Sequence, residues 1–259
     1  MPRLARARGW LQDRRASEQR PLPVAAWATF QASMPNLVTL LSLAAAILSL
    51  QALVRGDADL ALRLILVCVL LDGMDGTLAR QMRLTSPMGR QLDSLADLVA
   101  FGAAPATLLA AGPLGTEWPL ATLSGAIFAG AGAFRLARYN LEEGRSGFSG
   151  LPITAAGGVL AALASIPLGL PEMAYALAAL SLAALMVSRV HFESASSVRS
   201  RPSYLLLGGP IGLLGCIFLP GPVLAVIFGT VFGGYAVLGT AAAAWRHRPA
   251  PLRDRLGTF

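Results

Sequence analysis

Runs of about twenty mostly apolar residues recur along most of this chain, and they constrain its fold more than any other feature. A helix needs roughly 20 such residues to cross the hydrocarbon layer of a membrane, where backbone polar groups must bond within the element itself. Of the 259 residues, 55% are apolar and 14% are charged, whereas about a quarter of the residues of a soluble domain are charged. The sequence therefore predicts an all-α membrane protein.

Turn-forming residues divide the apolar sequence into candidate spans. Gly112-Pro113, the stretch from Gly169 to Pro171 and the stretch from Pro220 to Pro222 each mark a tight turn. The eight expected spans are 35–54, 60–80, 89–111, 117–139, 152–170, 173–190, 203–219 and 222–244. We expect a polytopic bundle of about eight transmembrane helices. Six or seven spans remain an alternative, because the prolines near residue 220 could kink one helix.

All 21 basic residues are arginine, and their distribution predicts the orientation of the chain. Only Arg55 and Arg63 fall on one side of the predicted bundle, and the other 19 fall on the opposite side. Loops rich in positive charge stay in the cytoplasm, so an even number of spans places both termini there. We expect a multi-pass protein of the cell (inner) membrane. The arginines form short clusters between apolar runs, so nothing indicates a partner nucleic acid.

One transmembrane domain accounts for most of the length. It is expected to cover residues 34–245, between an Arg-rich juxtamembrane segment at 1–33 and a tail at 246–259, both cytoplasmic. The first segment is expected to lie on the membrane surface, where anionic lipid attracts arginine.

Four aspartates occur in the stretch Leu71–Asp97. On the first of two neighbouring helices, residues at i, i+3, i+4 and i+7 share one face, namely Asp72, Asp75, Gly76 and Ala79. On the next helix, residues at i, i+4 and i+8 share one stripe, namely Gly89, Asp93 and Asp97. A short loop joins the two helices, so these faces can oppose each other in a cytoplasm-facing cavity.

Four carboxylates so placed need cations. A charged side chain at mid-bilayer costs roughly 2.5–3.5 kcal/mol, and Arg80 supplies only one nearby positive charge. Two divalent cations fit this need, and oxygen ligands without nearby His or Cys favour Mg²⁺ or Mn²⁺ over zinc. A transporter's cation pathway is an alternative, but it would place polar residues in several spans, whereas these acids cluster in two.

Such a metal pair suits transfer of a phosphoryl-type group, because the ions can bind a diphosphate and stabilise the leaving phosphate. Gly76 and Ala79 leave room for a nucleotide beside the first helix, and Arg80 can bind a phosphate or a base. Asp97, the last acid of its stripe, is our hypothesis for the general base that accepts the proton of an alcohol.

The complete pattern D-x-x-D-G-x-x-A-R-x8-G-x-x-x-D-x-x-x-D resembles the signature of the CDP-alcohol phosphatidyltransferase family, and every signature position is present. The resemblance implies that Asp72, Asp75 and Asp93 bind metal, and that Asp97 both binds metal and acts as the base. A Pro-Asn-x-x-Thr start of the first span also resembles the segment that lines the CDP site. The residues expected to bind CDP-diacylglycerol are Asn36, Thr39, Gly76, Ala79, Arg80, Ser86 and Gly89.

Further stretches resemble the integral-membrane phosphatidylserine synthases of this family. They are GRQLDSLADLVAFGAAPA (89–106), FRLARYN (134–140), FSGLP (148–152) and LMVSRVHF (185–192). The resemblance implies a homodimer that transfers a phosphatidyl group to L-serine and releases CMP. Inositol phosphate, glycerol 3-phosphate or choline are the alternative acceptors. Serine would need its carboxylate bound, and Arg135 and Arg138 are the candidates, unless they serve only as cytoplasmic topology signals.

Overall fold

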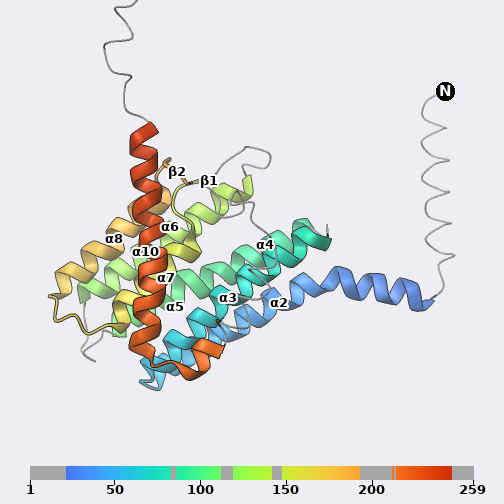
Figure 1. Cartoon of the computed structure of the whole chain (residues 1–259), viewed down its shortest axis with the longest axis horizontal. Helices are drawn as coiled ribbons and strands as arrows, with labels where there is room; N and C mark the ends of the chain where they lie inside the picture. The colour runs from blue at the N-terminus through green and yellow to red at the C-terminus, as the bar shows by residue number, and fades with distance from the viewer. Residues whose placement is uncertain are drawn as a thin grey trace, which may run out of the picture.

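The computed structural model describes residues 22–82, 86–111, 119–141, 148–192, 212 and 214–246. These residues are helical apart from connecting turns and one pair of two-residue strands (Figure 1). The elements are α2 (Leu22–Val54), α3 (Ala58–Met82), α4 (Pro87–Asp97), the π-helical segment η1 (Leu98–Ala103), α5 (Ala104–Ala111), α6 (Pro119–Leu141), β1 (Phe148–Ser149), α7 (Ile153–Ser165), α8 (Glu172–Val187), β2 (His191–Phe192) and α10 (Gly221–Arg246).

Four helices among the described residues are long and apolar enough to cross a membrane, and they cover 36–54, 87–111, 119–141 and 221–241. Two shorter apolar helices, α7 and α8, accompany them. The predicted helical membrane architecture is thereby confirmed. The count of eight spans stays a prediction, because most of the expected span at 203–219 lies outside the described residues.

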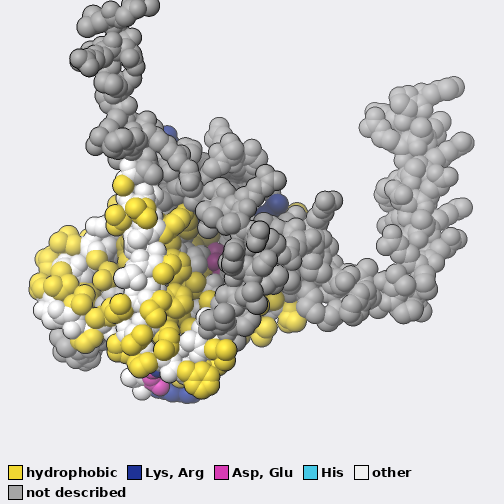
Figure 2. Space-filling model, viewed as in Figure 1, with side chains coloured by type: hydrophobic (Ala, Val, Ile, Leu, Met, Phe, Trp, Pro, Cys, Tyr) yellow, Lys and Arg dark blue, Asp and Glu magenta, His cyan; other side chains and the backbone are white. Residues whose placement is uncertain are grey.

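Apolar side chains cover much of the outer surface of the described helices, as Figure 2 shows. On α10, for example, Val237 is 66% exposed and Leu238 is 71% exposed, whereas Leu224 and Ala225 near its start are buried. A surface this apolar would be unfavourable in water, since soluble monomers rarely expose contiguous apolar patches beyond a few hundred Å². In a membrane the same surface contacts lipid.

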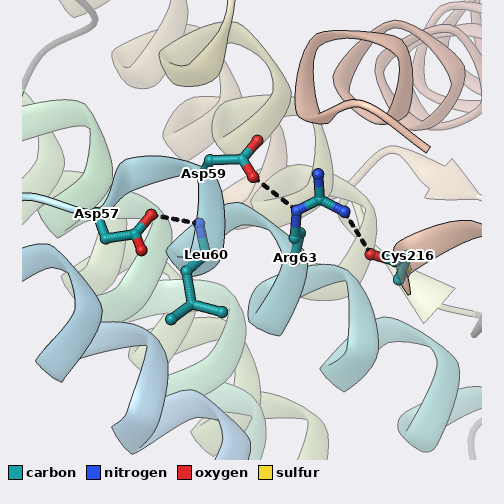
Figure 3. Close-up of polar contacts among 5 residues, drawn as sticks. All are labelled: Asp57, Asp59, Leu60, Arg63 and Cys216. Atoms are coloured by element: carbon teal, nitrogen blue, oxygen red, sulfur yellow. Dashed lines mark hydrogen bonds and ion pairs between the residues drawn. The ribbon is translucent and has the colours of Figure 1, made fainter. Parts of the chain in front are cut away.

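A tight turn joins α2 to α3, so the two helices pack antiparallel. Asp57 caps α3, because its Oδ1 atom accepts a hydrogen bond of 2.9 Å from the Leu60 amide (Figure 3). Along the pair, the Ser49 hydroxyl donates to the Ala61 carbonyl over 3.0 Å, and the Cys68 thiol donates to the Ser42 carbonyl over 3.3 Å. These contacts fix the register of α3 against α2.

An arginine near the start of α3 reaches the chain just before α10. The Arg63 Nε atom donates to Asp59 Oδ2 over 2.6 Å, and its Nη1 atom donates to the Cys216 carbonyl over 2.7 Å (Figure 3). This end of α3 is about 13 Å from Asp72, since nine residues at 1.5 Å each separate Arg63 from it. The arginine therefore stabilises the end of the bundle remote from the aspartates.

Helices α6 and α8 run parallel and are joined at both ends by side chains. At the amino ends, Glu172 Oε1 accepts hydrogen bonds from the Leu120 and Ala121 amides over 2.6 and 3.0 Å. Because early amides of a helix lack intrahelical acceptors, this carboxylate caps α6. At the carboxyl ends, Arg138 of α6 donates to the Val187 carbonyl at the end of α8 over 3.0 Å.

The span that begins with α4 contains a π-helical turn, η1, immediately after Asp97. The sequence predicts an ordinary helix over 89–111, so the π turn is a difference from expectation. Close packing accompanies it, since a Cβ atom added at Gly157 of α7 would lie 2.5 Å from the Phe101 carbonyl oxygen. Small residues let helices approach closely in membranes, and here they let α7 approach η1.

Candidate active site

Three aspartates from two helices meet near one point. The carboxylates of Asp72 on α3 and of Asp93 and Asp97 on α4 each place an oxygen within 4.8 Å of the others, and all three residues are half-buried. The predicted opposition of the two acidic stripes is confirmed for these residues. The side chains of the other predicted residues on α3 lie outside the described part of the structure, namely Asp75, Gly76, Ala79 and Arg80.

Local chemistry at the start of α4 sets the direction of its acidic stripe. Ser86 is the N-cap, and its hydroxyl accepts a 2.9 Å hydrogen bond from the Gly89 amide. Pro87 follows at the first helical position, where a missing amide hydrogen costs nothing. From this start, Asp93 and Asp97 fall one turn apart on the side that faces α3.

The donor set fits a hard divalent cation. Its members are carboxylate oxygens alone, which suits Mg²⁺ or Mn²⁺ better than zinc. Three carboxylates this close also repel one another unless positive charge is bound between them. Among the residues whose side chains the structure describes, Asp72, Asp93 and Asp97 could hold such an ion.

Three of the expected donor-binding residues lie together at the start of α4. A Cβ atom added at Gly89 would lie 2.9 Å from Asn36 Oδ1 and 3.1 Å from the Ser86 hydroxyl oxygen. Thr39, one turn along α2 from Asn36, is buried at 5% exposure. The close approach of α2 and α4 at this point therefore depends on a residue without a side chain.

The two predicted acceptor-binding arginines have different surroundings. Arg135 is 6% exposed, and its Nε atom makes no hydrogen bond within the described residues. Its guanidinium interacts electrostatically with the Asp97 carboxylate. Arg138 instead donates from Nη1 to the Val187 carbonyl and from Nη2 to the Ser188 carbonyl, over 3.0 and 3.3 Å. Within the described residues, the Arg135 guanidinium therefore has one donor without a partner, whereas the Nη atoms of Arg138 bond the end of α8.

Two polar residues near the aspartates were not predicted from the sequence. Thr154 of α7 donates from its hydroxyl to Asp72 Oδ2 over 3.1 Å. Asn140 of α6 donates from Nδ2 to the hydroxyl of Ser94, which neighbours Asp93, over 3.0 Å. Asn140 ends the stretch FRLARYN (134–140), and Thr154 lies two residues after FSGLP (148–152).

A comparison with protein families matches residues 32–191 to the model described as CDP-alcohol phosphatidyltransferase. This range is more than half of the chain and includes every residue of the aspartate cluster.

The chain belongs to this family.

Relatives of known name within the CDP-alcohol phosphatidyltransferases include three of different origin. A CDP-diacylglycerol–serine O-phosphatidyltransferase of Bacillus subtilis is 32% identical over 160 residues, which are 61% of this chain and 89% of that protein. One of Mycobacterium tuberculosis is 36% identical over 107 residues, 41% of this chain and 37% of that protein. An archaetidylserine synthase of Methanothermobacter thermautotrophicus is 33% identical over 127 residues, 48% of this chain and 54% of that protein. The similarity thus spans under two fifths of the mycobacterial protein's length.

Proposed function

We propose that this protein transfers the phosphatidyl group of CDP-diacylglycerol to the hydroxyl of L-serine, giving phosphatidylserine and CMP. The observation that carries the proposal is the cluster of Asp72, Asp93 and Asp97 inside the segment that matches the family. The names of the relatives support serine as the acceptor and a CDP-activated lipid as the donor.

The metal site of the proposal consists of Asp72, Asp75, Asp93 and Asp97, which would bind two divalent cations, Mg²⁺ or Mn²⁺. When bound, these ions would supply positive charge for the diphosphate of the donor. Before binding, the half-buried carboxylates disfavour one another, so a dication is the ligand that the cluster favours most.

Asp97 is the proposed general base, and the bond changes of the reaction then balance. The serine hydroxyl gives its proton to the Asp97 carboxylate, while its oxygen attacks the lipid-side (β) phosphorus of CDP-diacylglycerol. The bond from that phosphorus to the bridging diphosphate oxygen breaks, and this oxygen leaves with CMP. Positioned base catalysis of this kind typically contributes 10²–10⁴-fold to a rate.

The donor would lie along the start of α4 and the facing side of α2 and α3. The residues proposed to contact it are Asn36, Thr39, Gly76, Ala79, Arg80, Ser86 and Gly89. The compact arrangement of Asn36, Ser86 and Gly89 supports this proposal, because it brings a side-chain amide and a hydroxyl to one place. Such groups bind the polar parts of nucleotides.

The acceptor's carboxylate would bind to Arg135, with Arg138 beside it. A buried guanidinium with an unused donor is costly, and a carboxylate ligand would satisfy it with a strong charge-assisted hydrogen bond. Helix α6, which carries Arg135, packs against the η1 turn that follows Asp97, and this supports a position near the proposed base.

The membrane placement follows from the arginine bias together with the helical architecture. We propose a multi-pass protein of the cell (inner) membrane with both termini and a polar active-site cavity on the cytoplasmic side. The many small residues of the spans and the resemblance to the family support a homodimer as its assembly.

An acceptor panel tests the function. Purified protein is incubated with CDP-diacylglycerol, Mn²⁺ or Mg²⁺, and one alcohol at a time, and CMP release is measured. Release that requires serine supports the proposal. CMP release with inositol phosphate, glycerol 3-phosphate or choline, but not with serine, would show the same phosphatidyl transfer to a different acceptor alcohol. No release with any alcohol would contradict the enzyme proposal and favour a cation transporter.

A further inference from the structure

The contact between Thr154 and Asp72 joins residues 82 positions apart in the sequence. The Thr154 hydroxyl donates to Asp72 Oδ2 over 3.1 Å, and both residues are half-buried. Asp72 belongs to the carboxylate cluster, whereas Thr154 offers no charge of its own. The bond therefore acts on the orientation of Asp72 and leaves the net charge of the cluster unchanged.

Several backbone contacts fix the position of this hydroxyl. Thr154 is the second residue of α7, and the loop before it is bonded to the end of α8. The Gly150 amide donates to the Val190 carbonyl over 2.8 Å, and the Leu151 amide donates to the Leu185 carbonyl over 3.1 Å. Gly150 has a φ of +88°, and a Cβ atom there would collide with the Met186 carbonyl oxygen. These contacts therefore fix the start of α7 relative to the end of α8.

The side chain of Thr154 is itself suited to this contact. A β-branched residue in a helix has restricted χ1 freedom, so little entropy is lost when the hydroxyl is directed at Asp72. A carboxylate has about four lone-pair sites, and one hydroxyl occupies a single site. The bond from Thr154 therefore does not by itself exclude a cation from Asp72.

We propose that Thr154 is a positioning residue, whose hydroxyl holds the Asp72 carboxylate in the orientation that binds a divalent cation. This inference rests on the proposed function, since it deepens the description of the same metal site. Loss of a group that hydrogen-bonds and orients a metal-ligating side chain commonly lowers metal affinity 10–100-fold.

The test compares Thr154→Val, which keeps the shape of the side chain and removes its donor, with Thr154→Ser, which keeps the donor. Thr107→Val is the matched control, because the Thr107 hydroxyl on α5 bonds only the Ala103 carbonyl among the contacts described, over 2.9 Å. Mn²⁺ affinity is measured by electron paramagnetic resonance on each purified protein without lipid substrate. The unfolding temperature in EDTA measures the stability of each protein without bound metal.

We expect Thr154→Val to weaken Mn²⁺ binding about tenfold or more, while Thr154→Ser and Thr107→Val stay within about threefold of the wild type. A purely structural role would instead lower the unfolding temperature in EDTA and leave Mn²⁺ affinity unchanged. If Thr154→Val does not fold, Thr154→Ala provides the same comparison with Thr154→Ser.

The role is overturned if removing the hydroxyl leaves Mn²⁺ affinity unchanged, if Thr154→Ser is as weak as Thr154→Val, or if the wild type binds no Mn²⁺. The acceptor panel separates this outcome from the larger proposal. Serine-dependent CMP release together with unchanged Mn²⁺ affinity in Thr154→Val rejects the positioning role alone. The proposed function alone is rejected if Mn²⁺ binding depends on Thr154 but no alcohol causes CMP release from CDP-diacylglycerol.

Discussion

Asp97 has two proposed tasks, metal binding and proton transfer, and its surroundings are consistent with both. Its carboxylate shares the cluster with Asp72 and Asp93, and the buried Arg135 interacts with it electrostatically. Single residues in this cluster can therefore be tested for distinct effects on binding and on turnover.

Asp97→Asn is expected to lower kcat for CMP release by 10²-fold or more, because a neutral amide cannot take the serine proton. The measurement is initial rates at saturating CDP-diacylglycerol and serine. Asp59→Asn is the matched control, since Asp59 lies at the other end of the bundle in an exposed pair with Arg63. Exposed pairs contribute about 0–1 kcal/mol to stability, so the control should keep its activity. Wild-type rates from Asp97→Asn would remove this residue from the base role.

Arg135→Gln is expected to raise the KM for serine by about 10-fold or more and to leave the KM for CDP-diacylglycerol nearly unchanged, since a hydrogen bond to a charged group contributes roughly 1.5–3 kcal/mol. Steady-state kinetics with each substrate varied separately measures the two constants. Arg55→Gln, an exposed arginine at the end of α2, is the control. Equal changes in both KM values, or none, would contradict a role in binding the serine carboxylate.

Spacing alone was enough to predict that Asp72 would oppose Asp93 and Asp97, because helical periodicity and a short connection leave few other arrangements. Thr154 and Asn140 could not be predicted in the same way. Their partners, Asp72 and Ser94, lie on other elements 82 and 46 residues away. Contacts at such separations depend on how whole helices pack, which local periodicity does not reveal.

At the scale of the elements, the π-helical turn η1 is the main departure from expectation. Apolar periodicity predicts that 89–111 is helical, and it is, but it does not distinguish a π turn from an α turn. The turn begins directly after Asp97 and is packed by Gly157 of α7. Single π turns inside helices often occur at functional sites, which agrees with its place beside the carboxylate cluster.

Two glycine substitutions test the packing of α7 against η1. Gly157→Ala is expected to lower the free energy of unfolding by about 1–3 kcal/mol, because the new Cβ atom would lie 2.5 Å from the Phe101 carbonyl oxygen. Gly130→Ala on α6 is the control, since a Cβ atom there meets nothing within 4 Å. It should leave stability unchanged or raise it by up to about 1 kcal/mol through helix propensity. Thermal unfolding in detergent measures both, and equal shifts for the two variants would contradict the packing described.

At the scale of the whole molecule, the membrane class was predictable and is confirmed, because apolar length and low charge are properties of the sequence itself. Orientation rests on the arginine bias and is open to a direct test. The two native cysteines, Cys68 and Cys216, are buried, so replacing both with alanine leaves a background suited to labelling.

In that background, Arg55→Cys and Met88→Cys should respond differently to a membrane-impermeant thiol reagent. Arg55 follows α2, and Met88 is a 72% exposed residue at the start of α4, near the aspartates. In spheroplasts we expect labelling at position 55 without permeabilisation and at position 88 only after it. The reverse pattern would place the aspartate cluster on the outer side and contradict a cytoplasmic site.

The central claim is that dications held by the aspartate cluster enable phosphatidyl transfer to serine, and removing and restoring the metal tests it most directly. CMP release from CDP-diacylglycerol and serine is measured on purified protein first treated with EDTA and then supplied with excess Mn²⁺ or Mg²⁺. We predict no release after chelation and full recovery with the added ion. Undiminished CMP release in EDTA would contradict the account, and so would the absence of CMP release with serine at saturating Mn²⁺ or Mg²⁺.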